Sequence, residues 1–350
     1  MSHASNSGSA LRLAGKHESD GEYAHALKIL NIAYKTYKQA PLRSIIKMNI
    51  DRIMLKVASL ARNQPRYVVP IYESAENPRL YNPQSGQASL PLISLTTIHH
   101  RLPRIHQTIK SLKEQTKAVH SINLYISNSP FLLDAGIEAD DHLLKEVSDM
   151  GVNVYLVPNI GPYRKQYPII WQLHDAQASM ETAIITVDDD VYYPKEIIEI
   201  LMSKLEMEES IIAHRGRKIA FSGGQIGPYK SFSMPDDGSS YMNMGTGKNG
   251  IAYRLRYFPS NIDEYIGPFL APTADDLWCK WVTAAHCIPT HILEPRAAID
   301  PSLDFTETHD DKNGLFHKYN AKGTNDDAII SLEMFFACRH KGIATMRGVN

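Results

Sequence analysis

Three consecutive carboxylates, Asp188, Asp189 and Asp190, follow directly on an apolar segment that predicts a β-strand, Ala183 to Val187. Adjacent like charges repel one another, so their position at the end of a buried strand predicts a cation there. Hard divalent ions such as Mg²⁺ or Mn²⁺ prefer carboxylate oxygens and are usually held by one or two carboxylates together with substrate phosphates. The sequence therefore predicts a metal–nucleotide site. The alternative is a solvated acidic turn that caps a helix beginning near Pro194.

The segments that must position these carboxylates alternate between strand-like and helix-like patterns. Strands are predicted at 92–97, 122–127, 152–157 and 183–187, and helices at 102–112, 143–147 and 169–178. Strands spaced by helices imply right-handed crossovers and a mostly parallel sheet, so the predicted fold class is α/β. In such sheets ligands bind at the carboxyl ends of the strands, and the acid triplet falls at such an end.

The N-terminal part of the chain has a different organisation. The sequence of residues 1–66 predicts a helical stem or cap. Its first nine or so residues are rich in Ser and Asn and are predicted to be disordered. The spacing of Gly21, Tyr23, Ala26 and Leu30 is typical of the second half of one tetratricopeptide repeat, which cannot bury its own face. The proline-rich segment 67–90 is predicted to be a linker, and residues 91–350 are predicted to form the α/β domain.

Composition limits the partners and the compartment. The 350 residues carry a net charge of −1, so the chain as a whole has no bias toward nucleic acid. Residues 28–66, however, contain nine Lys or Arg against one acid, Asp51, which predicts either a peripheral membrane contact or a solvated positive face. Three cysteines without a CxxC pair, and the lack of a secretory signal or a membrane span, indicate a cytoplasmic setting.

Several motifs together resemble a known family. They are the strand that ends in Thr96-Thr97, then Arg101-Leu-Pro-Arg104, Pro162-Tyr-Arg-Lys165, Thr186-Val-Asp-Asp-Asp-Val-Tyr-Tyr-Pro194, a Gly-rich stretch, and Pro272-Thr-Ala-Asp-Asp-Leu-Trp278. This set resembles bacterial GT-A type glycosyltransferases that build lipopolysaccharide or capsular polysaccharide. The resemblance covers about residues 90–350, and it implies a GT-A, Rossmann-like domain behind the N-terminal helical appendage.

The resemblance also implies roles for individual residues. Asp188 and Asp190 would hold Mn²⁺ or Mg²⁺ as part of a DxD motif, with His309 and His317 as candidate third ligands and a surface-loop histidine as the alternative. Arg and Lys side chains in loops that follow strands suit a diphosphate, since Arg makes bidentate phosphate contacts. Lys165 is the first choice among them, and a solvated charge is the alternative for each. The implied donor-binding residues are Thr97, Arg101, Arg104, Arg164, Lys165, Asp188, Asp189, Gly247 and Asn249.

A second acid pair, Asp275 and Asp276, opens a predicted helix that carries Leu277, Trp281 and Ala285 on one face. Because Asp is stabilised at a helix N-terminus, one interpretation is a simple cap. The other comes from the resemblance, in which Asp276 corresponds to the second acid of a motif that supplies the base in inverting enzymes. Asp275 stands where Glu is commoner, so either acid is a candidate base.

Together these features predict a metal-dependent glycosyltransferase that moves a sugar from a nucleotide-sugar, with a UDP-sugar as first choice, to a saccharide or lipid-linked acceptor. One alternative is a sugar nucleotidyltransferase. Such enzymes usually carry a Gly-rich basic loop after the first strand, where this chain has Thr96 to His100. The other is a helical adaptor with a degenerate transferase domain.

Overall fold

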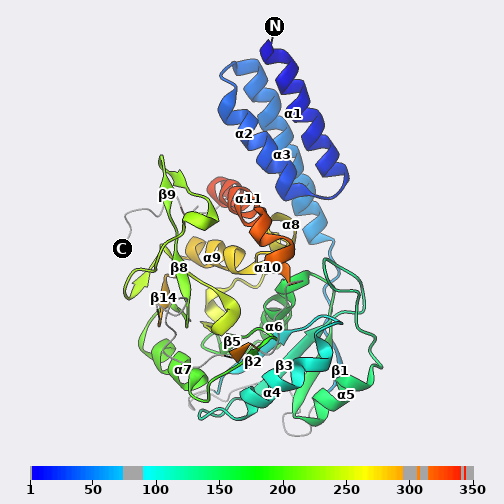
Figure 1. Ribbon diagram of the computed structural model, residues 1–350, viewed down its shortest axis with the longest axis vertical. Helices are drawn as coiled ribbons and strands as arrows, with labels where there is room; N and C mark the ends of the chain where they lie inside the picture. The colour runs from blue at the N-terminus through cyan, green and yellow to red at the C-terminus, as the bar shows by residue number, and fades with distance from the viewer. Residues whose placement is uncertain (1, 74–89, 295–305, 308–313, 340–342, 344–350) are drawn as a thin grey trace.

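The computed structural model describes residues 2–73, 90–294, 306–307, 314–339 and 343, and its centre is a nine-stranded sheet (Figure 1). In spatial order the strands are β1 (Val69–Tyr72), β4 (Val152–Leu156), β3 (Ser121–Ile126), β2 (Leu92–Thr96), β5 (Ala183–Thr186), β13 (Ile251–Arg254), β7 (Ile211–Ala213), β14 (Thr290–Ile292) and β11 (Ser239–Ser240). All except β1, β13 and β11 run in the same direction. The predicted α/β fold with a mostly parallel sheet is therefore confirmed.

Helices flank this sheet, as the alternating pattern predicted. They are α4 (Ile105–Lys113), α5 (His142–Asp149), α6 (Tyr167–Asp175), α7 (Ile197–Met207), α8 (Gly267–Leu270), α9 (Asp275–Ala285), α10 (Leu315–Lys318) and α11 (Thr324–Arg339). The end of α5 shows why the local sequence stops there: Gly151 adopts φ 88°, a left-handed conformation that glycine takes without strain.

The four predicted strands are β2, β3, β4 and β5, which lie side by side in the sheet. All six residues of β3 are buried, as expected for a parallel strand covered on both faces. Beyond the end of β5, the Val187 amide still donates to the Ser94 carbonyl of β2. The carboxyl ends of these two strands therefore lie together, which brings Thr97 close to the acid triplet.

The second half of the sheet differs from the simple alternation. Strand β13 runs antiparallel between β5 and β7, and α7, which follows β5 and precedes β7 in the chain, packs against β13 and β7. Three two-stranded ribbons complete the domain, namely β6 (Val191–Tyr192) with β15 (Thr306–Glu307), β8 (Gly216–Lys218) with β12 (Asn243–Gly245), and β9 (Phe221–Ser222) with β10 (Gln225–Ile226).

The N-terminal stem consists of three helices, α1 (Ser2–Ser19), α2 (Tyr23–Thr36) and α3 (Ala40–Arg62), which extend from the domain in Figure 1. The predicted helical stem is present, but residues 2–9 lie within α1, so the expected disorder is replaced by helix. The linker prediction also needs correction, because β1 lies inside it and pairs with β4 as an edge strand. The rest of that segment, 74–89, lies outside the described residues.

The stem packs on the domain through α2 and α11. Leu27 and Leu30 of α2 are buried, and Ser331 Oγ donates a 3.2 Å hydrogen bond to the Ala24 carbonyl. His25 Nδ1 lies 2.9 Å from Asp327 Oδ2, and Lys28 forms an ion pair with the same carboxylate. The apolar face of the helical stem, which a single repeat cannot bury alone, is thus covered by α11.

Several cations of the basic stretch have intramolecular partners. Arg52 and Lys56 pair with Glu18, and Arg66 pairs with Asp175. Others, such as Lys38 and Arg62, are exposed. Within the described part of the chain, the helices are all too short or too polar to cross a bilayer.

Candidate active site

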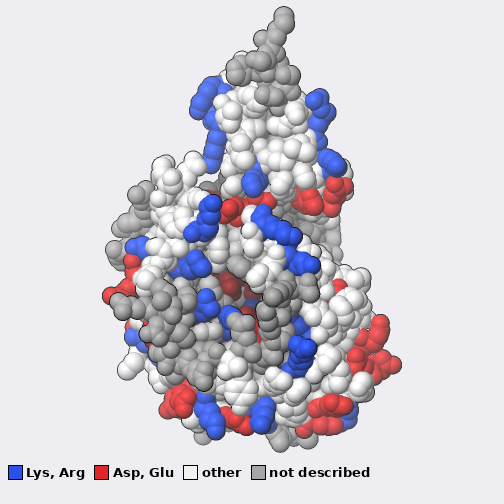
Figure 2. Space-filling model, viewed as in Figure 1, with Lys and Arg blue, Asp and Glu red and all other residues white. Residues whose placement is uncertain are grey.

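A pocket of about 530 Å³ opens at the carboxyl ends of β2 and β5. This volume falls within the usual range for small-molecule sites. The pocket is lined by both acid clusters, Asp188 to Asp190 and Asp275 with Asp276, although more than eighty residues separate them in sequence. Figure 2 shows a hollow on this face with acidic side chains inside it and basic side chains around it. The fold therefore assembles one site from the two clusters.

Two contacts through Tyr193 position the start of the acid triplet. The Asp188 amide lies 2.9 Å from Tyr193 Oη, and that hydroxyl donates to the Lys248 carbonyl at 3.0 Å. Lys248 belongs to the 3₁₀ turn η4 (Gly247–Asn249). Tyr193 thus fixes the end of β5 against the Gly-rich turn, a role that sequence reasoning missed.

The three carboxylates of the triplet have different partners. Asp188 Oδ1 lies 2.7 Å from Lys165 Nζ. Asp189 is buried and accepts hydrogen bonds from Thr97 Oγ1 at 2.6 Å and from an Arg101 guanidinium nitrogen at 2.8 Å. Asp190 has a longer 3.4 Å contact with Arg101, and 25% of its side chain is exposed. Asp189 therefore anchors the turn, while Asp188 and Asp190 are more accessible.

These partners set the ionisation of the triplet. Burial opposes the charge of Asp188, but Lys165 outweighs it and lowers the pKa of that carboxyl. Burial and repulsion from Asp189 and Asp188 raise the pKa of Asp190 to about 7, although Arg101 acts in the opposite direction. Without another cation, the triplet is therefore reluctant to carry its full negative charge near neutral pH.

Lys165 joins the two acid clusters. It lies at the end of the 3₁₀ helix η2 (Gly161–Lys165), and its ammonium is 2.7 Å from Asp188 and 3.1 Å from Asp275 Oδ2. Burial alone would lower the pKa of Lys165, but Asp188, Asp275 and Asp276 raise it well above the usual range. Lys165 is thus a permanent cation at the centre of the pocket wall, where the sequence predicted a site residue.

Asp276 lies beside Lys165 at the start of α9. Its Oδ2 accepts a 3.0 Å hydrogen bond from the Gly247 amide, whereas its Oδ1 is buried and has no hydrogen-bond partner among the described residues. Burial and the neighbouring Asp275 raise the pKa of Asp276 to about 7. One oxygen is held by a backbone amide and the other is unpaired in the part that the structure describes, so Asp276 can serve as a general base if an acceptor hydroxyl comes within hydrogen-bond reach of Oδ1.

The atoms around Gly247 leave little room for a side chain. A Cβ atom there would lie 3.0 Å from Lys165 Nζ, 3.1 Å from Asp276 Oδ1 and 3.5 Å from Asp188 Oδ1. The absence of a side chain leaves room between the two acid clusters. Gly247 lines the pocket at this point.

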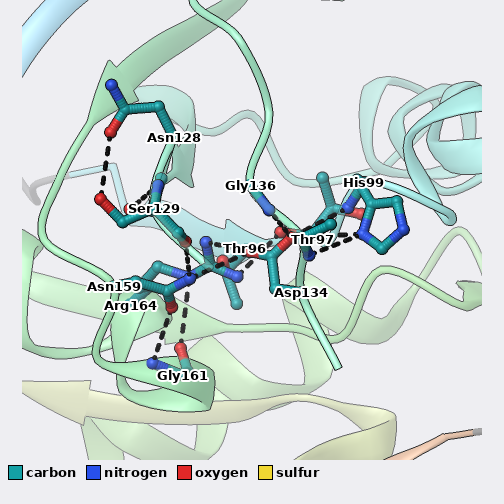
Figure 3. Close-up of polar contacts among 12 residues, drawn as sticks. Thr96, Thr97, His99, Asn128, Ser129, Asp134, Gly136, Asn159, Gly161 and Arg164 are labelled. Atoms are coloured by element: carbon teal, nitrogen blue, oxygen red, sulfur yellow. Dashed lines mark hydrogen bonds and ion pairs between the residues drawn. The ribbon is translucent and has the colours of Figure 1, made fainter. Parts of the chain in front are cut away.

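Arg164 does not make the predicted kind of contact. Its side chain is 1% exposed, lies 2.8 Å from Asp134 Oδ2 and donates to the Thr97 carbonyl at 3.1 Å (Figure 3). Asp134 also accepts from the amides of His99 and Gly136. The guanidinium therefore ties three loops together in the pocket wall, which Arg164 and Asp134 both line, and its ionic partner there is Asp134. Nothing in the local sequence around Asp134 signals this partner.

Of the other predicted residues, two lie elsewhere, a third is not placed, and the exposed His317 lines the pocket. Arg104 is exposed and is not among the described residues that line the pocket. Asn249 is buried, and its amide nitrogen lies 3.2 Å from His214 Nδ1, so it packs behind the Gly-rich turn. His309 lies outside the described residues. Thr97 and Arg101 do line the pocket, but both are engaged with Asp189.

Sequence reasoning also missed a group of pocket residues from the second half of the domain. They include Arg215, Arg217, Tyr229, Thr273, Asn320 and Asn325. The only available signal was the basic run Arg215 to Lys218, which follows the apolar residues of β7. The segments that carry the other residues meet at the pocket only through tertiary packing.

The donor set fits a divalent cation that is completed by substrate. Asp188 and Asp190 are the two triplet carboxylates with exposed area, 30% and 25% of their side chains. Within the described residues, no group of three or more His, Cys, Asp or Glu is arranged to hold an ion. Mg²⁺ typically takes one or two carboxylates and completes its shell with phosphates and water. These two carboxylates would therefore hold the ion together with a bound diphosphate.

Comparisons with known proteins give only distant similarities. No protein-family model and no curated protein matches this chain. One similar solved structure is 4-diphosphocytidyl-2C-methyl-D-erythritol synthase, at 10% identity and TM-score 0.39 over 68% of this chain and 100% of that one. Another is S. aureus TarS 1–349 in complex with UDP, at 15% identity and TM-score 0.34 over 57% and 56%. A third is the mannosyltransferase PcManGT from Pyrobaculum calidifontis in complex with GDP-Man and Mn²⁺, at 12% identity and TM-score 0.31 over 93% and 89%.

Proposed function

We propose that this chain is a metal-dependent GT-A glycosyltransferase that moves a sugar from a nucleotide-sugar to a saccharide acceptor. One observation carries the proposal: two acid clusters, distant in sequence, share one pocket and are joined there by Lys165. One cluster lies at the carboxyl end of a central strand, where α/β sheets bind ligands. The other presents a carboxylate oxygen, Asp276 Oδ1, that has no partner among the described residues.

The residues divide the chemistry between them. Asp188 and Asp190 would hold Mn²⁺ or Mg²⁺, which when bound neutralises negative charge on the leaving diphosphate. Lys165 adds a fixed positive charge beside them. Asp276 takes the proton of the acceptor hydroxyl at Oδ1, while the Gly247 amide holds Oδ2 in place. This division predicts inversion at the anomeric carbon, because the base acts on the attacking hydroxyl and no protein nucleophile is needed.

The wider setting belongs to the same proposal. The motifs favour synthesis of bacterial surface polysaccharide, with a UDP-sugar as donor and a saccharide or lipid-linked glycan as acceptor. The exposed cations of α3 would allow peripheral contact with an anionic membrane. Vesicle sedimentation with and without 0.5 M salt tests that contact, since electrostatic binding should be lost at high salt.

The central test is calorimetric titration with a panel of UDP-, GDP-, CMP- and dTDP-sugars, each with Mn²⁺, with Mg²⁺ and with EDTA. We expect at least one donor to bind in a metal-dependent way, and Asp190→Asn to weaken that binding. Asp140→Asn is the matched control, because Asp140 is an exposed carboxylate outside the pocket. If the whole panel fails to bind with metal present, the proposal is wrong. If binding is unchanged in EDTA, the metal has no part in it.

A further inference from the structure

Two arginines at the start of β8, Arg215 just before the strand and Arg217 within it, form a second positively charged part of the pocket. Gly216 lies between them and faces the packed interior, because a Cβ there would be 2.3 Å from the Met244 carbonyl oxygen and 2.4 Å from Ile292 Cδ1. Alternate residues of a strand point to opposite sides. Arg215 and Arg217 therefore both point away from that interior, and both line the pocket.

These arginines differ from the other pocket arginines in their partners. Arg101 and Arg164 each pair with a carboxylate. Among the described residues, Arg215 has no side-chain hydrogen bond or ion pair, and Arg217 has only a 3.5 Å contact with the Phe232 carbonyl and lies 5.4 Å from the centre of the Tyr229 ring. Half-buried cations without a carboxylate partner favour an anionic ligand, because burial weakens their hydration.

The position of Tyr229 shows on which side of the pocket this pair lies. The pKa of the Tyr229 hydroxyl is raised by burial and by Asp276, and is lowered by Arg217 and Arg215. Hydrogen bonds place the pair in the same way. The Thr246 amide donates to the Arg215 carbonyl at 3.0 Å, and the amide of the next residue, Gly247, donates to Asp276 Oδ2 at 3.0 Å. The backbone that carries Arg215 therefore lies beside the turn that holds the proposed base. An acceptor whose hydroxyl reaches Asp276 would extend toward Arg215 and Arg217.

We propose that Arg215 and Arg217 form a subsite for an anionic group, a phosphate or a carboxylate, on the acceptor saccharide. This inference rests on the glycosyltransferase function proposed above. Guanidinium groups suit it because they bind either anion through paired hydrogen bonds. The acceptor would then be an acidic glycan, held by its charge at one end and presented through its hydroxyl to Asp276.

The test compares three probes of similar size: methyl glucoside, glucose 6-phosphate and glucuronic acid. Each is titrated by NMR into the full chain, first alone and then with saturating UDP and Mg²⁺, so that the diphosphate position is already filled. The variants are Arg215→Gln, Arg217→Gln and Arg217→Lys. Lys230→Gln is the control, because Lys230 is a nearby exposed cation that does not line the pocket.

We expect at least one charged probe to bind about tenfold or more tightly than methyl glucoside, with UDP present. Each Arg→Gln variant should reduce this preference about tenfold, Arg217→Lys should restore part of it, and Lys230→Gln should leave it unchanged. The phosphate and carboxylate probes identify which anion is preferred. Thermal unfolding of each variant shows whether it is folded, and if one arginine variant is unfolded the other still decides.

Three results would overturn the subsite. They are equal binding of charged and neutral probes, a charged preference that survives both Arg→Gln variants, and displacement of the charged probe by UDP. The last result would assign the arginines to the donor diphosphate. Failure of UDP to bind with metal would instead count against the proposed function, while the titrations without nucleotide would still decide whether the two arginines bind an anion.

Discussion

The ammonium group of Lys165 lies 2.7 Å from Asp188 Oδ1 and so ties the end of the acid-tipped strand to the loop before α6. The same nitrogen is 3.1 Å from Asp275, so a single buried cation balances carboxylates from two distant segments. Removing one member of a buried ion pair is strongly destabilising, because the remaining charge stays buried and uncompensated. The assembly of the site and the stability of the fold therefore depend on the same residue.

Lys165→Met should lower the free energy of unfolding by about 3–5 kcal/mol at pH 8. Urea denaturation measures this loss. The loss should shrink toward pH 4, because the carboxylates left without Lys165 can then take up protons instead of remaining buried and charged. Lys165→Met combined with Asp275→Asn should be more stable than Lys165→Met alone. An equal loss at both pH values would show that packing of the lysine stem, and not its charge, is what matters.

The Asp276→Asn variant tests whether Asp276 is a catalytic base or only a helix cap. An Asn side-chain oxygen can still accept from the Gly247 amide, so the fold should survive, but Asn cannot accept the proton of the acceptor. The transfer rate should fall by about 10² to 10⁴, with donor affinity nearly unchanged. Stopped-time assays with calorimetry of donor binding measure the two quantities, and NMR of the product reports the anomer. A normal rate, or a retained configuration, would move the role to Asp275 or to another mechanism.

Gly247→Ala should reduce activity more than stability. The added methyl group would lie 3.0 Å from Lys165 Nζ and 3.1 Å from Asp276 Oδ1, and both are ends of side chains that can shift. A small displacement of reacting groups costs roughly tenfold to a hundredfold in rate. Gly15→Ala is the matched control, since no atom lies within 4 Å of its Cβ position in α1 and helix propensity favours Ala there. Full activity in Gly247→Ala would place the reacting groups away from this turn.

Asp190→Asn should stabilise the metal-free chain at neutral pH. The pKa of Asp190 is raised to about 7 in the folded chain, above its ordinary value in the unfolded chain. The folded state therefore binds more protons than the unfolded state between about pH 4 and pH 7, and stability falls as the pH rises through that window. The variant lacks this penalty, so in EDTA it should exceed the parent chain by on the order of 1 kcal/mol at pH 8 and match it near pH 4.

Thermal unfolding across this pH range measures the Asp190 effect, with Asp140→Asn as the exposed-carboxylate control. Added Mn²⁺ should reverse the order at pH 8, because the ion stabilises only the chain that retains the carboxylate. A parent chain that stays more stable than Asp190→Asn in EDTA at every pH would contradict the proposed charge crowding.

The parts of the fold that could be predicted are those with local signals. The strands β2 to β5 are short, predominantly apolar segments, and the acid triplet after β5 is visible as a break in that pattern. By contrast, β13 has no local sign that it runs antiparallel, since that follows from where the chain returns to the sheet. Residues 2–9 of α1 were missed because their Ser- and Asn-rich composition predicts disorder, whereas in the structure they continue a helix that packs against α2.

In the candidate site, too, local sequence predicts some features of single residues and tertiary contacts decide others. Lys165 and Arg164 are adjacent basic residues in one loop, and sequence reasoning assigned both to the diphosphate. In a 3₁₀ helix neighbouring side chains point in different directions, so Lys165 enters the pocket while Arg164 meets the buried Asp134. Asn249 was misplaced for a similar reason, because its partner His214 comes from another strand end. Residue type predicted the chemistry, but only tertiary contacts decide direction.

The packing of α2 on α11 has a consequence for synthesis of the chain. His25 and Asp327 are 302 positions apart, so α11, the docking surface for α2, is made about 300 residues after α2 itself. At a translation rate of about 5–20 residues per second, Leu27 and Leu30 wait roughly 15–60 s for that surface. During this time the apolar side of α2 is open to chaperones or to other nascent chains. The stem helices, although translated before α11, reach their native environment only when α11 has left the ribosome.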